Sequence, residues 1–189
     1  RAYTRGNGKE GQDVSWIVEY ITIGNINTGF VRGELIVSKE QWEDIKFISQ
    51  NPRNFVSGYI SRKKISKRWM KYIDFVAYEY ITEPRLPFKE QLELLTKKKY
   101  NVVRYSVHDT LTSKTLSDIL IANRSSSSYE IDGVIITNNE VHERIPNKNS
   151  PYAKAFKMVL DDQRAESTVL DINWKPSMYG LLKPVVRIE

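Results

Sequence analysis

The order of the apolar segments constrains the fold of this chain more than any other feature. Up to the serine run at 125–128, strand-like stretches rich in β-branched and aromatic residues alternate with stretches of helical spacing. After it, strand candidates follow one another with no helix between them, at 132–137, 152–159, 167–174 and 183–189. This order predicts an α+β fold of antiparallel sheets with flanking helices, which runs into a β-rich part.

Local signals in the first part indicate where each element lies. Helical spacing or a helix-start signal occurs at 14–21, 39–48, 87–95 and 113–123, and strand patterns occur at 28–37, 73–81 and 101–107. Ser38 followed by Gln41 forms a capping box, and Pro87 suits the first turn of a helix. The serine run is too short for a linker, and we expect it to be a loop.

The length of the chain, 189 residues, allows one substantial core, or one domain and the beginning of another. We expect domains at 1–160 and 161–189. The chain has no cysteine, which excludes disulfides and thiolate metal sites within these residues. No apolar stretch is long enough to cross a membrane, so we expect a cytoplasmic protein without a membrane partner.

The charge of the chain favours a polyanionic partner. The formal net charge is +6 and the isoelectric point is about 9.3. The densest basic runs are SRKKISKRW, residues 61–69, and KKK, residues 97–99. Basic residues beside aromatics suit a nucleic-acid backbone, but such a run is as often a solvated face, and both interpretations stay open here.

The stretch EIDGVIITNN, residues 130–139, has an acid and a glycine at the entrance of a strand. The β-branched run 134–137 suits a buried strand. Asp132 and Gly133 do not fit that pattern, because a buried carboxylate without a partner or a metal is costly. Two interpretations remain open on these residues alone: a turn with Asp-Gly at its corner, or an acid placed for chemistry.

Six stretches of the chain, taken in order, resemble one family. They are TRGNGKEGQDV (4–14), VRGE (31–34), NPRN (51–54), FVAYEY (75–80), Arg124 with EIDGVII (130–136), and YAKAFK (152–157). Together they are similar to the nucleotidyltransferase, or adenylation, domain of the NAD-dependent DNA ligases, and the likeness extends over residues 3–187. The resemblance implies that family's ATP-grasp-like nucleotidyltransferase fold, with the last strands beginning an OB-type, oligonucleotide-binding β-barrel.

The resemblance also implies an activity. The family moves AMP from NAD to a lysine of the enzyme and then to a DNA 5′-phosphate, so it seals nicks through enzyme–AMP and DNA–adenylate intermediates. Such phosphoryl chemistry needs cations at phosphate oxygens, a carboxylate for the ribose, an aromatic for the base and a magnesium site. The implied cofactors are NAD and Mg²⁺, and the implied partner is nicked duplex DNA.

By the same resemblance, three residues are expected to be catalytic. Glu34 would accept hydrogen bonds from the ribose, Lys157 would contact the AMP phosphate, and Asp132 would help to hold the divalent metal. Arg53 and Arg124 match arginines of the family's nucleotide site, where guanidinium donors suit phosphate oxygens.

Further positions follow from the same motifs. Tyr78 is expected to stack on the adenine, although an aromatic in FVAYEY equally suits a core position. His108 and His142 have no spacing that indicates a metal site, and we expect ordinary polar histidines. The expected DNA contacts are Arg5, Arg62, Lys63 and Lys64.

Several positions depart from the family pattern. Thr137 stands where the family usually has a lysine, so one phosphate contact is missing or is supplied from elsewhere. Ser61 stands in place of an arginine, Phe30 in place of the acid before VRGE, and Asn7 in place of the acid of RGDG. These changes indicate a divergent member of the family, such as a viral or phage enzyme.

The largest departure concerns the nucleophile. The family's attacking lysine lies in a K-x-D-G motif upstream of TRGDG, and no K-x-D-G occurs in these 189 residues. We therefore expect either a fragment of a longer ligase or one half of a split ligase whose lysine lies on a second polypeptide. The alternative of another class is a non-catalytic nucleic-acid-binding subunit that keeps the fold.

Overall fold

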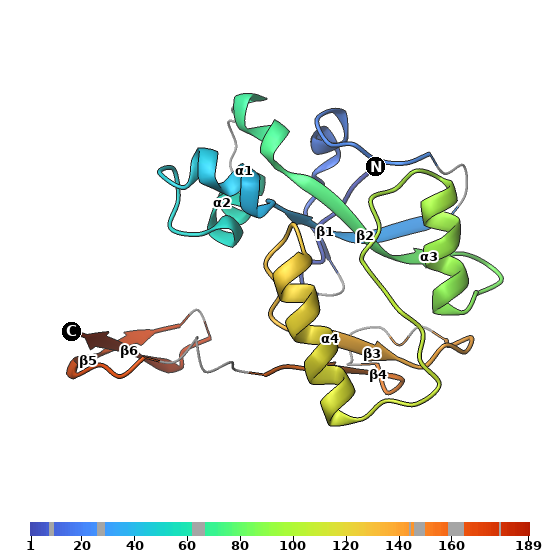
Figure 1. Ribbon diagram of the computed structural model, residues 1–189. Helices are drawn as coiled ribbons and strands as arrows, with labels where there is room; N and C mark the ends of the chain where they lie inside the picture. Colours follow the sequence, from blue (N-terminus) through green and yellow to red (C-terminus); the bar gives the residue numbers. More distant parts are fainter. Residues whose placement is uncertain are drawn as a thin grey trace. The chain divides into compact units, whose positions relative to one another are not determined.

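The computed structural model describes residues 1–7, 10–25, 29–61, 67–143, 145, 150–158, 165–177 and 179–189. The chain divides into two compact units, Arg1–Lys157 and Met158–Glu189. Its described strands form separate two-stranded antiparallel sheets, and helices pack beside the first of them (Figure 1). The α+β class expected from the sequence is therefore confirmed.

Strands β1 (Phe30–Ile36) and β2 (Asp74–Ile81) form the central sheet of the first unit. The two strands run antiparallel, and their register shifts between Arg32 and Gly33. A side chain at Gly33 would lie 2.5 Å from the ring of Phe75 and 2.5 Å from the carbonyl oxygen of Val76, so this position requires a glycine. Both strands lie where the sequence predicts them.

One hydrophobic core of the first unit is built by four helical elements: η1 (Ser15–Glu19), α1 (Lys39–Ile45), α2 (Pro52–Ile60) and η2 (Lys67–Tyr72). Ile17, Ile45, Phe55 and Met70 are fully buried in it. These buried side chains hold the short helices together, because elements of this length are marginal by themselves.

The ends of these helices explain one success and two failures of the sequence-based prediction. The capping box is confirmed, since Ser38 and Gln41 each bond the backbone N–H of the other. The helix expected at 14–21 is wrong in type: it is a short 3₁₀ helix, whose N-cap residue Val14 offers no side-chain acceptor. Helix α2 was not predicted, although Asn51 caps it and Pro52 occupies its first turn.

A second core joins strand β2 to helix α3 (Phe88–Lys97), which lies beside it in Figure 1. Leu92 and Leu95 pack against Ala77. The buried amide of Gln91 accepts a hydrogen bond from the Tyr80 N–H and donates one to the carbonyl of Leu86, so its polar atoms do not weaken this core.

The strand expected at 101–107 is largely wrong. Residue Val102 forms one isolated parallel bridge with Ala77, and the Val103 N–H donates to the Ala77 carbonyl. Beyond Val103 the chain leaves the edge of β2 and continues without regular structure to the next helix. The valines gave a strand pattern, but pairing beyond one bridge depends on the course of the chain, which local pattern does not determine.

Helix α4 (Ser113–Ser126) and strands β3 (Val134–Thr137) and β4 (Ala153–Phe156) complete the first unit. The helix extends into the serine run that was expected to be a loop. Strands β3 and β4 pair antiparallel, with Val134 opposite Phe156. No helix in the described part of the chain is long and apolar enough to cross a lipid bilayer.

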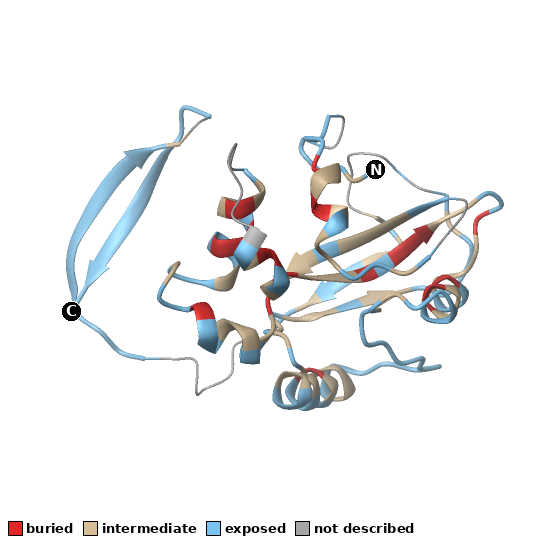
Figure 2. Ribbon diagram, turned by 90° about the horizontal axis from the view of Figure 1, so that it is seen from above, coloured by how far each residue is buried: buried red, intermediate tan, exposed pale blue. Residues whose placement is uncertain are grey.

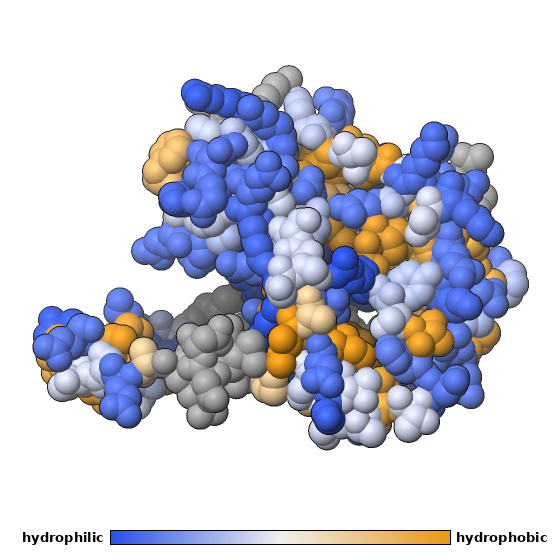
Figure 3. Space-filling view, viewed as in Figure 1, coloured by the Kyte–Doolittle hydropathy of each residue, from blue (hydrophilic) through white to orange (hydrophobic). Residues whose placement is uncertain are grey.

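The second unit contains one antiparallel hairpin of strands β5 (Val169–Pro176) and β6 (Leu182–Ile188). Every residue of both strands is exposed, as the uniform pale blue in Figure 2 shows. Apolar side chains are among them, including Trp174 and Leu182 at 62% and 64% exposure. Figure 3 shows apolar and hydrophilic residues side by side on this hairpin.

Candidate functional site

The first unit contains a broad open cleft with a volume of about 3690 Å³. Small-ligand pockets usually measure roughly 300–1000 Å³, so this is a groove and not a closed pocket. Its walls are the β1–β2 sheet on one side and the β3–β4 sheet on the other, with the 102–109 segment and α4 between them. The expected site residues that line it are Arg5, Glu34, Arg53, Tyr78, Asp132 and Lys157.

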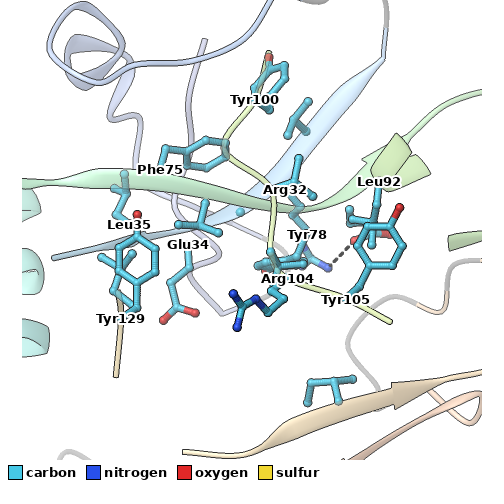
Figure 4. Close-up of a pocket in the computed structure, with 18 of the residues that line it drawn as sticks. Arg32, Glu34, Leu35, Phe75, Tyr78, Leu92, Tyr100, Arg104, Tyr105 and Tyr129 are labelled. Atoms are coloured by element: carbon cyan, nitrogen blue, oxygen red, sulfur yellow. Dashed lines mark hydrogen bonds and ion pairs between the residues drawn. The ribbon is translucent and has the colours of Figure 1, made fainter. Parts of the chain in front are cut away.

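The β1–β2 wall carries Glu34 and Tyr78. At the register shift Arg32 lies opposite Glu79 and Gly33 opposite Ala77, which leaves Tyr78 without a cross-strand partner. Such a bulge re-aims a side chain, and Figure 4 shows Tyr78 and Glu34 on the cleft side of the sheet. Burial raises the pKa of the Tyr78 phenol, and the Arg32 guanidinium opposes that rise.

The same wall carries an ion network that the sequence did not reveal. The nearly buried carboxylate of Glu79 accepts from Arg32 at 3.3 Å and from Arg85 at 3.2 Å. Both of its oxygens are thereby paired, which offsets the cost of burying the charge. The network fixes Arg32 near Tyr78, and the sequence did not reveal it because Arg32 lies 47 residues from Glu79 along the chain.

The β3–β4 wall brings Asp132 and Lys157 together. A side chain at Gly133 would lie 2.4 Å from the carbonyl oxygen of Phe156 and 2.8 Å from Cγ of Lys157. The Asp-Gly pair therefore packs directly on the end of β4, and only glycine fits there. Asp132 itself is exposed, so its carboxylate incurs no burial cost, and the close approach explains the glycine beside it.

Two expected arginines line the cleft from other elements. Arg53 lies in the first turn of α2, and its side chain is exposed. Arg5 lies in the N-terminal loop, near enough to Tyr78 to lower the pKa of the phenol, while burial remains the larger effect and raises it. The expected DNA contacts Arg62, Lys63 and Lys64 lie outside the described residues.

Comparison of the sequence with known proteins identifies the family of this chain. The family model for the NAD-dependent DNA ligase adenylation domain matches residues 1–158. The chain belongs to this family. The resemblance inferred from the sequence motifs is therefore confirmed.

The curated relatives are DNA ligases of viruses and bacteria. The chain is 33% identical to the DNA ligase of Acanthamoeba polyphaga mimivirus over 200 residues, which cover 100% of the chain and 30% of that protein. It is 32% identical to the putative DNA ligase 205R of Invertebrate iridescent virus 6, with 100% and 32% covered. A bacterial relative, the DNA ligase of Ehrlichia canis, is 26% identical. The chain spans about a third of the length of these relatives.

Arg124 of this adenylation domain does not line the cleft. Its Nε donates to the carbonyl of Ile131 at 3.0 Å, and its Nη2 donates to the carbonyl of Asp132 at 3.1 Å. Charge-assisted bonds of this kind hold a loop firmly. The guanidinium thus fixes the loop that presents Asp132, and the direct nucleotide contact expected from the family motif stays a prediction.

Two cleft residues were missed by the sequence-based prediction. Arg104 lies in the segment that leaves β2, and its Nη1 donates to Ser126 Oγ at 2.7 Å and to Asn123 Oδ1 at 3.4 Å. Tyr129 donates from its hydroxyl to Asp74 Oδ2 at 3.0 Å. Both lie among residues whose pattern indicated a strand or a loop, and only the tertiary arrangement brings them to the cleft (Figure 4).

The residues of this cleft suit a magnesium ion that is held partly by the substrate. Among the residues that the structure describes, no three His, Asp or Glu side chains gather into a ready-made metal cage. Mg²⁺ is commonly held by one or two carboxylates together with substrate phosphates and water. The exposed carboxylate of Asp132, beside Lys157 on the cleft wall, suits that arrangement.

Proposed function

We propose that this chain forms the nucleotide-binding part of an NAD-dependent DNA ligase that seals nicks in duplex DNA. The observation that carries the proposal is the shared cleft: Glu34 and Tyr78 lie on one wall, and Asp132 and Lys157 lie on the other. These side chains offer a carboxylate for ribose hydroxyls, an aromatic face for a base, and a cation with a metal-binding acid for phosphate. The membership of the chain in the adenylation-domain family supports the same conclusion.

In this proposal the chain positions the nucleotide and neutralises its charge. Glu34 holds the ribose and Tyr78 stacks on the adenine, so that the α-phosphate lies toward Lys157 and Arg53. Bound Mg²⁺ would supply further neutralisation of phosphate charge. Lys157 stabilises the negative charge that develops on the phosphate oxygens in the transition state, which is the main requirement of phosphoryl transfer.

The attacking lysine of the first step is supplied by a K-x-D-G segment in the same protein or on a second polypeptide. Its neutral amine forms a bond to the α-phosphorus of NAD, and nicotinamide mononucleotide leaves. The DNA 5′-phosphate then displaces the lysine, and the 3′-hydroxyl displaces AMP. Nicked duplex DNA is the proposed partner, with Arg5 and the basic run at 61–69 on its backbone.

We also propose that the domains divide near residue 160, at 1–160 and 161–189, and that the hairpin β5–β6 begins an OB-type barrel. Its exposed apolar residues support this, because a two-stranded hairpin without further strands is at best marginally stable in water.

A labelling experiment tests the proposed function. The 189-residue chain is incubated with Mg²⁺ and NAD that carries a label in its adenylate half, and covalent label is sought after denaturation. We expect none, because these 189 residues contain no K-x-D-G motif to supply the attacking lysine. Adding a peptide segment with K-x-D-G should then produce label on that segment. Label on the chain alone would show that the attacking residue lies within these 189 residues. No label on the chain or on the added segment would contradict the proposed function.

A further inference from the structure

We propose that Arg104 is a phosphate-contacting residue of the nucleotide site, an assignment that rests on the proposed function. Arg104 lies on the segment that leaves the edge of β2 after the bridge between Val102 and Ala77. Its side chain lines the same cleft as Glu34 and Tyr78, and Figure 4 draws it among the labelled cleft residues. The failure of the expected strand at 101–107 is what puts this cation in the cleft.

The guanidinium of Arg104 is anchored by one nitrogen only. Its Nη1 donates to Ser126 Oγ at 2.7 Å and to Asn123 Oδ1 at 3.4 Å, both on the last turn of α4. Its Nε and Nη2 make no hydrogen bond to any described residue. A guanidinium that is fixed along one side and has donors left over is pre-organised for the oxygens of an anion.

The positive charge of Arg104 is also unpaired within the described part of the chain. No carboxylate there lies within ion-pair distance of it, and its anchors Ser126 and Asn123 are neutral. Arg32 and Arg85, by contrast, share the carboxylate of Glu79. Arg104 therefore brings a positive charge, unpaired among the described residues, into the cleft that Glu34 also lines.

A purely structural role would be to cap α4, and other groups already do that. The N–H of Ser127 donates to the carbonyl of Asn123 at 2.9 Å, and Nζ of Lys39 donates to the carbonyl of Arg124 at 2.9 Å. Arg104 bonds side chains instead of these backbone carbonyls, and its own side chain is exposed. Water can replace it at Ser126, so its loss should change the stability of the fold little.

The ligand chemistry that suits this charge is a nucleotide phosphate. Base and ribose are neutral and need no cation, whereas a phosphate does. On the opposite wall Thr137 carries no charge, although the family pattern predicts a lysine there. Arg104 can supply that positive charge from the other side of the cleft.

The test compares two probes, AMP and adenosine, which differ only in the phosphate. Calorimetry measures the affinity of the 189-residue chain for each, at low ionic strength, in the unmodified chain and in Arg104→Ala, Arg104→Lys and Glu34→Ala. We expect Arg104→Ala to lower the affinity for AMP about tenfold and to change the affinity for adenosine by no more than about twofold. Arg104→Lys should keep part of the AMP affinity that Arg104→Ala loses. Glu34→Ala should lower the affinity for both AMP and adenosine.

The matched control is Arg187→Ala, which removes an exposed arginine of β6 that does not line the cleft. It should leave both affinities unchanged, and thermal unfolding without nucleotide reports folding of every variant. Two results for Arg104→Ala would assign Arg104 a structural role. One is an equal loss of affinity for AMP and adenosine; the other is a lower unfolding temperature with no change in the ratio of the two affinities.

The remaining outcomes separate this inference from the proposed function. If AMP binding survives in Arg104→Ala while binding to nicked duplex DNA weakens, the guanidinium serves a DNA phosphate and the inference is wrong. If Glu34→Ala weakens AMP and Arg104→Ala does not, the inference alone fails. If the unmodified chain binds neither probe, the nucleotide site fails and the inference fails with it.

Discussion

The β1–β2 sheet and the β3–β4 sheet face the same cleft, but they are supported differently. The β1–β2 wall has a packed underside, where Ala77 and Leu95 are fully buried and α3 covers β2. In β3 and β4, all of whose residues are described, none is fully buried. The second wall is held by the hydrogen bonds of Arg124 and by the close contact at Gly133.

This difference indicates how each wall responds to change. The geometry of the first wall is part of a hydrophobic core, so a disturbance there lowers the free energy of unfolding. The geometry of the second depends on a few polar contacts, so a disturbance there moves functional groups at little cost in stability. The predictions below test this contrast, from the largest expected effect to the smallest, in a ligase that combines this chain with a K-x-D-G segment.

The largest effect is expected where both walls meet the substrate. Glu34→Ala and Lys157→Ala should each lower the rate of nick sealing by about 100-fold or more, because each removes a charged contact to the reacting nucleotide. Gel-based sealing assays on a nicked duplex measure this. Lys154→Ala is the control, since Lys154 is an exposed residue of β4, the strand just before Lys157, and does not line the cleft. Near-normal sealing by either variant would remove that residue from the site.

The two glycines give the sharpest contrast between the walls. Gly33→Ala places a methyl against the Phe75 ring and should lower the free energy of unfolding by about 2 kcal/mol. Gly133→Ala should lower it by less than Gly33→Ala does, because β3 and β4 are not part of a core, but it should slow sealing about tenfold, because the methyl pushes Asp132 away from the end of β4 and Lys157. Chemical denaturation measures the unfolding free energy of both variants, and sealing assays measure their rates. Equal stability losses would show that the walls are supported alike.

Arg124 tests whether hydrogen bonds alone hold the second wall. Arg124→Lys keeps the charge but cannot bond the carbonyls of Ile131 and Asp132 in the same forked geometry. We expect sealing to slow by about tenfold while the unfolding free energy changes by about 1 kcal/mol. Full activity in this variant would mean that the charge, and not the fork, is what the loop requires.

The smallest effect concerns the contact that links the walls. Tyr129, which precedes β3, donates to Asp74 at the start of β2 and accepts from Asn101 at 3.0 Å. Tyr129→Phe should cost about 1 kcal/mol of stability at neutral pH. Thermal unfolding measures this cost.

The same tyrosine gives a pH dependence. Burial raises the pKa of the Tyr129 phenol, so the native state keeps the proton more tightly than the unfolded chain does. Its contribution to stability is therefore complete below the usual tyrosine pKa of about 10 and is lost above it. Tyr129→Phe should unfold with a weaker dependence on alkaline pH, and an unchanged dependence would exclude Tyr129 as its source.

Local pattern predicted those parts of the fold that depend on local physics. The capping box at Ser38, the strands at 28–37 and 73–81 and the four later strands follow from side-chain spacing and cap chemistry. The strand at 101–107 failed because a strand needs a partner along its length, and β2 offers one only at Ala77. The 3₁₀ form of residues 15–19 and the helix α2 also depended on packing that spacing does not show.

The candidate site divides in the same way. Motifs led to Glu34, Tyr78, Asp132 and Lys157, which the cleft brings together. They could not predict that Arg124 would hold carbonyls, that Glu79 would join two arginines, or that Arg104 would enter the cleft. Those contacts depend on how the chain folds back on itself, at separations from 6 to 47 residues, and a single sequence carries no direct signal of such pairs.

The cleft walls share no strand, since β1–β2 and β3–β4 are separate sheets. A ligand that touches both walls must therefore fix their separation, and part of its interaction energy is spent on that ordering. A compound that binds the Glu34 and Tyr78 wall alone would not incur this cost. For inhibitor design, the first fragments to try are therefore rigid adenosine-like molecules without phosphate, which would compete with the nucleotide while leaving the second wall free to move.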